Sequence, residues 1–276
     1  MTKQTDLIGN HPNAEHPLGA WLKANDIPAT ATKCHRELTE INNEENENLI
    51  LWMAKKIISH HYDSFRLEQL KKKYAELGFP KYAEQNRKLP IVDKVKKGNA
   101  TEIILIEYIQ STLNKELTHA FKLRYNPNVD QAIKGDDTLL VDLFQQESGD
   151  DLKIYLGESK FRKIPDKTAV NDISFSLEKE KMPLSYPFLV QEIAKTNKGL
   201  ASKLDDFIVQ DIKDKGQLIY TGLLLSNQNT SANVERNLNN DNPELIFISI
   251  GIQNPENFIN LVFDKANELI ANPSTL

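Results

Sequence analysis

Asp137, Glu158 and Lys160 have the side-chain types and the spacing of a site that could hold a divalent cation beside a phosphate group. Glu158 and Lys160 stand two residues apart after the apolar run 152–156, and side chains two apart in a strand point to the same face. Asp137 precedes a second apolar run, 139–144, and a polar, turn-forming segment joins the two runs. An antiparallel hairpin would therefore bring Asp137 beside Glu158.

This set of side chains predicts metal-dependent hydrolysis of a phosphodiester. Two carboxylates on one face, completed by backbone or water oxygens, suit a hard cation such as Mg²⁺ or Mn²⁺. A lysine nearby can assist the attacking water or neutralise the charge that develops on the phosphate. The structural alternative is that Asp137 is a turn residue, while Glu158 and Lys160 form a cross-strand ion pair at a sheet edge. The spacing alone leaves both interpretations open.

The surrounding pattern predicts the elements that would position these residues. Asn99 or Thr101 could cap a helix that runs to about Leu117 and is apolar nearly all round at its start, so it should be buried. The apolar runs 217–225 and 244–251 predict strands covered on both faces. Further helices are predicted from Thr168 as cap, over 187–195 and from 254 to about 271. This order predicts an α/β fold with a central mixed sheet flanked by helices.

The N-terminal third carries no motif of this kind. Residues 1–35 show little periodicity, which predicts irregular structure with short strands or turns at most. Helical patterns are expected from Thr39 to about Tyr62 and again over 65–77. We therefore expect a mostly helical N-terminal region, residues 1–95, followed by the core, residues 96–276. The Asn-rich stretch 227–242 is expected to be a polar loop.

Composition limits the class of protein. A single cysteine, Cys34, excludes an internal disulfide and a cysteine-rich metal site, and no secretory signal or membrane span is recognisable, so a cytoplasmic protein without membrane contact is expected. The net charge of −5 is unusual for a protein that holds nucleic acid on its own. Either basic residues cluster locally, as after the second strand at Lys160, Arg162 and Lys163, or another protein delivers the nucleic acid.

Three stretches carry a resemblance to a known family: 98–108 (GNATEIILIEY), 134–137 (KGDD) and 155–163 (YLGESKFRK). They are similar to the PD-(D/E)xK nuclease superfamily and, more narrowly, to the HamA nucleases of the Hachiman anti-phage defence system. The resemblance implies a restriction-endonuclease-like core with Asp137, Glu158 and Lys160 at the catalytic positions. It also implies that an acid from the first core helix joins the metal site; Glu102 matches best and Glu107 second.

The resemblance further implies a DNA nuclease that a separate superfamily 2 helicase, HamB-like, restrains until it is released to degrade DNA. Asp136 competes with Asp137 for the catalytic position, because no Pro-Asp pair precedes the hairpin. No Walker-type phosphate-binding motif occurs, so ATP-driven translocation would belong to another chain. The alternatives are a non-catalytic docking subunit of a DNA-processing complex and a stand-alone restriction endonuclease.

Overall fold

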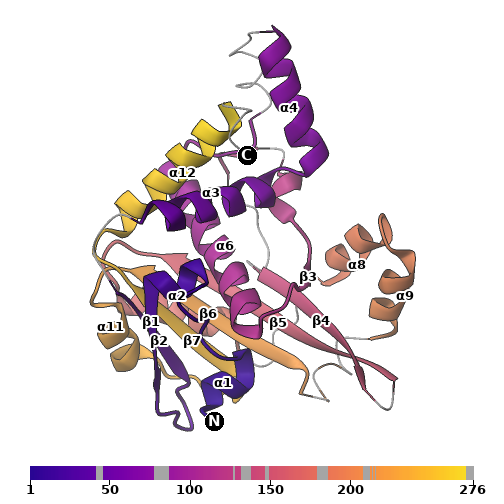
Figure 1. The fold of residues 1–276 in the computed structure, drawn as a ribbon. Helices are drawn as coiled ribbons and strands as arrows, with labels where there is room; N and C mark the ends of the chain where they lie inside the picture. Colours follow the sequence, from indigo (N-terminus) through magenta and orange to yellow (C-terminus); the bar gives the residue numbers. More distant parts are fainter. Residues whose placement is uncertain are drawn as a thin grey trace.

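The structure, a computed structural model, describes residues 1–41, 46–77, 87–126, 128–131, 138–146, 149–178, 186–207, 212, 214 and 216–271. Their strands form one mixed sheet in the order β1-β2-β7-β6-β5-β4-β3, with helices on both faces (Figure 1), which confirms the predicted fold class. The strands are β1 (Leu22–Ile27), β2 (His35–Glu40), β3 (Thr118–His119), β4 (Thr138–Gln146), β5 (Gly149–Phe161), β6 (Leu218–Ser226) and β7 (Leu245–Gly251).

Two layers of helices cover the sheet. The first layer contains α1 (Lys3–Ile8), α2 (Pro17–Trp21), α3 (Glu47–His61), α6 (Asp93–Leu113) and α12 (Pro255–Ala271), and the second contains α7 (Lys167–Ser176), α8 (Tyr186–Ala194), α9 (Lys198–Asp206) and α11 (Thr230–Asn237). A short 3₁₀ helix, η1 (Lys122–Tyr125), follows β3. The helix α4 (Ser64–Leu77) extends away from the sheet at the top of Figure 1.

The central strands follow the predicted order. β4 and β5 form the expected antiparallel hairpin, with Thr138 opposite Gly157 at its open end. β5, β6 and β7 are parallel neighbours, and parallel neighbours need helical crossovers, which α7 to α9 and α11 provide. Every residue of β6 and β7 is buried, as the continuous apolar runs predicted. The predicted helices α8 and α12 are also confirmed, each within a residue of its expected start.

The N-terminal region contributes strands as well as helices. The predicted helical start at Thr39 is wrong, because His35–Glu40 forms β2, which pairs in parallel with β7 and antiparallel with β1. Pairing on both sides overrides the local helical pattern. The helix α3 begins later, where the Asn46 side chain accepts a hydrogen bond from the Leu49 amide. Residues 1–35 are also more regular than predicted, since they contain α1, α2 and β1.

Three other expectations about the helices are wrong. The helix α6 begins at Asp93, so neither Asn99 nor Thr101 caps it, and the Thr101 hydroxyl instead donates to carbonyl oxygens inside the helix. The helix α7 is capped by Asp166, whose carboxylate accepts from the Ala169 amide, and not by Thr168. The expected loop 227–242 contains α11. That helix buries only Thr230 and Val234, which explains why its apolar pattern was too weak to recognise.

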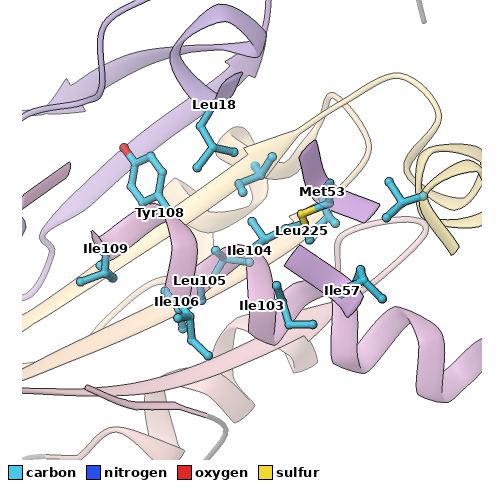
Figure 2. Close-up of a cluster of buried hydrophobic side chains, with 14 of the residues drawn as sticks. Leu18, Met53, Ile57, Ile103, Ile104, Leu105, Ile106, Tyr108, Ile109 and Leu225 are labelled. Atoms are coloured by element: carbon cyan, nitrogen blue, oxygen red, sulfur yellow. The ribbon is translucent and has the colours of Figure 1, made fainter. Parts of the chain in front are cut away.

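The first helical layer encloses the larger part of the core. Met53 and Ile57 of α3, Ile103 and Ile104 of α6 and Leu225 of β6 belong to one cluster of buried side chains (Figure 2). All residues from 99 to 109 of α6 are buried, which confirms the prediction of a helix covered nearly all round. This burial fixes α6 against the sheet, and with it the acidic side chains that the helix carries.

The close packing of α6 on β5 depends on Gly157. A Cβ atom at this position would lie 2.7 Å from Leu105 Cδ2 and 2.9 Å from Thr138 Cβ. We expect Gly157→Ala to lower the free energy of unfolding by about 1–3 kcal/mol, the usual cost of overpacking. Gly98→Ala is the matched control, because Gly98 lies on the exposed side of α6 and nothing stands within 4 Å of its Cβ position.

The control should stabilise the protein by about 0.5–1 kcal/mol, the difference in helix propensity between alanine and glycine. Urea denaturation of both variants measures the two changes. Equal shifts of the same sign would contradict the close approach of α6 to β5.

Candidate active site

Glu158 and Lys160 lie together on one face of β5. The Lys160 ammonium donates to Glu158 Oε1 at 3.1 Å, and the two side chains are 25% and 17% exposed, respectively. Ser159 between them is buried and points to the other face. The predicted alternation is therefore confirmed, and both charged groups reach solvent from a strand whose preceding residues Ile154 and Leu156 are buried in the core.

The ion pair expected under the structural alternative is present, but it is neither cross-strand nor at a sheet edge. Both partners belong to β5, which lies between β4 and β6 in the sheet. The residue of β6 next to Glu158 is Gly222. A Cβ atom at Gly222 would come within 2.7 Å of Ile173 Cγ2, so α7 packs tightly on this face just beside the carboxylate.

The pair lies toward the carboxyl end of β5, where Lys160 is the last residue but one, and Glu158 is level with Gly222 in the middle of β6. Asp136 and Asp137 lie outside the described residues, so their positions are not given. Their neighbour in the chain, Thr138, pairs with Gly157, which is the neighbour of Glu158.

Glu102 is placed on the other side of β5. It is almost fully buried on α6, and its Oε2 lies 3.2 Å from the Lys122 ammonium of η1. Along the same helix Leu105 meets Gly157, and the Lys97 ammonium lies 5.3 Å from the centre of the Phe161 ring. Since Glu102 comes between Lys97 and Leu105, it is level with the Glu158–Lys160 segment but approaches from the opposite face.

Glu107, the second candidate acid of α6, points toward α3 instead. Its two carboxylate oxygens accept from His60 Nε2 at 3.0 Å and from the Lys56 ammonium at 2.7 Å. Burial raises the pKa of this carboxyl, but His60 and Lys56 more than offset burial and leave the pKa below its usual value. Glu107 is therefore an ionised, buried group that belongs to a different part of the molecule.

Lys163, a basic residue after β5, lines a cleft that the sequence did not reveal. Lys163 and Lys97 both bind the carboxylate of Glu256, at 2.8 Å and 2.6 Å, and together they lower its pKa to about 2. The cleft, about 410 Å³, is lined by Lys163, Glu256 and residues that follow β6 and β7, including Asn227 and Asn254. Glu256 could not be associated with Lys97 from the sequence, because 159 positions separate them.

The donor atoms of this region suit a hard cation only in part. Carboxylate oxygens are ligands for Mg²⁺ and Mn²⁺, and Glu158 offers them from a partly exposed position. Across the described ranges, no group of three or more His, Cys, Asp or Glu side chains is arranged to hold a metal ion. A cation beside Glu158 would therefore also need Asp137 or water oxygens. In the same ranges, no helix is long and apolar enough to cross a membrane.

Comparison with known proteins identifies the family. The family model HamA matches residues 17–266. The Hachiman protein HamA of Bacillus cereus is 35% identical over 272 residues, an alignment that covers 96% of each chain. These matches extend through the N-terminal strands and the whole sheet, well beyond the segments that carry Glu158 and Lys160. The chain therefore belongs to the HamA family of Hachiman anti-phage defence proteins.

Proposed function

We propose that this protein is a Mg²⁺-dependent DNA nuclease, the effector of a two-component defence system. Asp137 and Glu158 are the proposed metal ligands, and Lys160 assists the attacking water; Glu102, predicted as a third ligand, approaches from the opposite face of β5 and is not assigned to this metal. The observation that carries the proposal is the Glu158–Lys160 pair, which projects from the internal strand β5 and is partly exposed to solvent.

Each residue has a defined part in the proposed chemistry. A bound Mg²⁺ supplies Lewis-acid stabilisation of the charge on the scissile phosphate. Glu158 holds one side of the site and keeps the Lys160 ammonium within 3.1 Å of its carboxylate. The ammonium is then close enough to orient a water molecule and to neutralise the negative charge that develops as the phosphodiester is attacked.

Asp137 is preferred over Asp136 because of the hairpin register. Residues opposite each other in an antiparallel ladder point to the same face. Thr138 is opposite Gly157, so one further step of the same ladder would set position 137 opposite Glu158 and position 136 opposite Ser159. We expect Asp137→Asn to lower DNA cleavage at least about a hundredfold, as loss of a group that stabilises transition-state charge does, and Asp136→Asn to cut near the wild-type rate.

Degradation of a linear plasmid in Mg²⁺, followed on gels, measures both variants. The reverse order, with Asp136→Asn inactive and Asp137→Asn active, would show that the ladder does not continue in register. Addition of EDTA should stop cleavage by the wild type, and excess Mg²⁺ should restore it. If cleavage continues in EDTA, the activity does not depend on a divalent cation and that part of the proposal is wrong.

A separate superfamily 2 helicase is proposed as the partner that restrains the nuclease and delivers DNA to it. The sequence supports this in two ways: the net charge is −5, and there is no Walker-type motif. Lys163 lines the 410 Å³ cleft and shares the Glu256 carboxylate with Lys97, so the three groups together leave one positive charge for a DNA backbone. A stand-alone restriction endonuclease would instead cut DNA at defined sequences without any partner.

A further inference from the structure

A second and larger cleft lies away from the Glu158–Lys160 pair, between α3, α6 and β3. Its volume is about 790 Å³, which is within the range of small-molecule sites. Four of the six histidines of the chain line it: His11, His16, His60 and His119. The proposed hydrolysis does not use these imidazole groups, and two of them, His60 and His119, are largely buried.

His119 holds an acceptor atom that lacks a donor. Its Nδ1 lies 3.1 Å from the carbonyl oxygen of Leu117, so Nδ1 carries the hydrogen and Nε2 carries the lone pair. Nε2 is buried, and none of the described residues hydrogen-bonds to it. Burial lowers the pKa of His119 to about 4, so the ring is neutral near pH 7. A buried acceptor of this kind costs free energy until something donates to it.

His60 provides a second imidazole lone pair, on a ring that stacks with His119. Its Nε2 donates to the ionised carboxylate of Glu107 at 3.0 Å, and burial outweighs Glu107 and keeps the pKa of the imidazole below its usual value. A neutral ring that donates through Nε2 has its lone pair on Nδ1. The rings of His60 and His119 are stacked, with centroids 5.4 Å apart and planes 24° apart. Phe121 lies 4.2 Å from His119 and extends this aromatic wall.

The charges in the cleft argue against an ionic group at the imidazole rings themselves and leave any phosphate of the ligand outside the ring wall. Lys56 is paired with Glu107, Lys115 is paired with Asp142, and Glu116 adds a carboxylate to the lining. The described side chains also contain no cluster of three or more metal ligands. The ligand that fits is a flat, neutral group with N–H donors, which can satisfy imidazole lone pairs and lie against aromatic rings.

We propose that this cleft binds a nucleobase, either in a free nucleotide or in an unpaired stretch of nucleic acid, through hydrogen bonds to His119 Nε2 and His60 Nδ1. The exocyclic amino group of adenine or cytosine is a suitable donor. The inference does not rest on the proposed nuclease activity, because the residues that form the cleft lie apart from Glu158 and Lys160. The chain nevertheless connects the two places, since Phe121 is followed directly by Lys122, the partner of Glu102.

Isothermal titration calorimetry with the full-length chain tests the proposal. The probes are AMP, a short oligodeoxyadenylate, an abasic strand of the same length, and ribose 5-phosphate. We expect AMP, the oligodeoxyadenylate or both to bind with a dissociation constant below about 1 mM; binding of AMP points to a free nucleotide, and binding of the strand alone points to unpaired nucleic acid. If the abasic strand or ribose 5-phosphate binds as tightly, or if no probe binds, the proposal is overturned.

Two variants of His119 make the test specific. His119→Phe keeps a ring in the aromatic wall but removes the acceptor, and it should weaken binding at least about tenfold, a difference expected for one lost hydrogen bond in a buried site. His119→Gln retains a carbonyl acceptor and should recover part of the affinity. Glu158→Gln should bind the probe as the wild type does, which separates this site from the proposed catalysis. Unchanged binding by a folded His119→Phe variant would contradict the assignment.

Discussion

Replacing Glu158 by Gln is expected to lower the rate of Mg²⁺-dependent DNA cleavage at least about a hundredfold. Loss of one group that stabilises the charge of a transition state usually has an effect of this size. The amide keeps the shape of the side chain but removes the charge that would hold the cation. The fold should be preserved, because the carboxylate is partly exposed and contacts Lys160 at a site open to solvent. Circular dichroism and thermal unfolding verify that the variant is folded before its cleavage rate is compared.

Binding of Mn²⁺ distinguishes the part played by Glu158 from that of Lys160. Glu158→Gln should lose both metal affinity and cleavage, whereas Lys160→Met should lose cleavage and retain the metal. Glu178→Gln is a matched control, since Glu178 is an exposed carboxylate that follows α7 outside the proposed site. If Glu158→Gln binds Mn²⁺ and cuts DNA as the control does, Glu158 is not a ligand.

Breaking the buried ion pair between Arg36 and Asp26 should have the largest effect on stability. Arg36 of β2 is only 1% exposed, and its guanidinium donates to both carboxylate oxygens of Asp26 in β1, at 2.6 Å and 3.0 Å. It also donates to the carbonyl oxygen of Gly9 at 3.0 Å, so it ties the end of α1 to the two strands. We expect Arg36→Met to lower the free energy of unfolding by about 3–5 kcal/mol, because it leaves a largely buried carboxylate without its cation.

Chemical denaturation of Arg36→Met beside Arg66→Met measures this effect, since Arg66 is exposed on α4 and should tolerate the change. The double variant Asp26→Leu/Arg36→Met should be more stable than Arg36→Met alone, because it removes the unpaired charge as well. A loss of stability in Arg36→Met no greater than in Arg66→Met would show that the ion pair does not stabilise the sheet.

The pH dependence of this pair has a defined sign. Burial raises the pKa of Asp26, but the hydrogen bonds from Arg36 and Thr2 more than offset burial and leave the pKa below its usual value of 3.8. A carboxyl whose pKa is lowered by folding stabilises the folded state above its unfolded pKa and loses this contribution as the pH falls through the folded pKa. The stability difference between wild type and Asp26→Asn should therefore shrink at acidic pH.

The predictable parts of the fold are those whose sequence pattern lies within one segment or two adjacent segments of the chain. The apolar runs of β6 and β7 and the alternation around Glu158 follow from contacts that each strand makes along its whole length. The hairpin of β4 and β5 also needs only adjacent segments. For the same reason, the two-residue spacing of Glu158 and Lys160 in one strand was enough to predict that their side chains lie side by side.

The remaining features depend on contacts between distant segments. The end of β2, from Thr39, has a helical pattern by itself but belongs to a strand because β7, more than 200 positions later in the chain, pairs with it. Glu256 meets Lys97 across 159 positions, and the cleft of His60 and His119 requires α3, α6 and β3 to assemble. The periodicity of a sequence contains no information on contacts between distant segments, so neither cleft was predicted.

The most direct test of the central claim is degradation of DNA in Mg²⁺ by the purified wild-type chain, alone and together with its cognate partner, beside Glu158→Gln and Lys160→Met. We expect the wild type to degrade DNA in at least one of the two preparations, and both variants to leave the DNA intact in each. If the wild type never cuts DNA in either preparation, or if both variants cut as fast as the wild type, then Glu158 and Lys160 are not the active site of a nuclease.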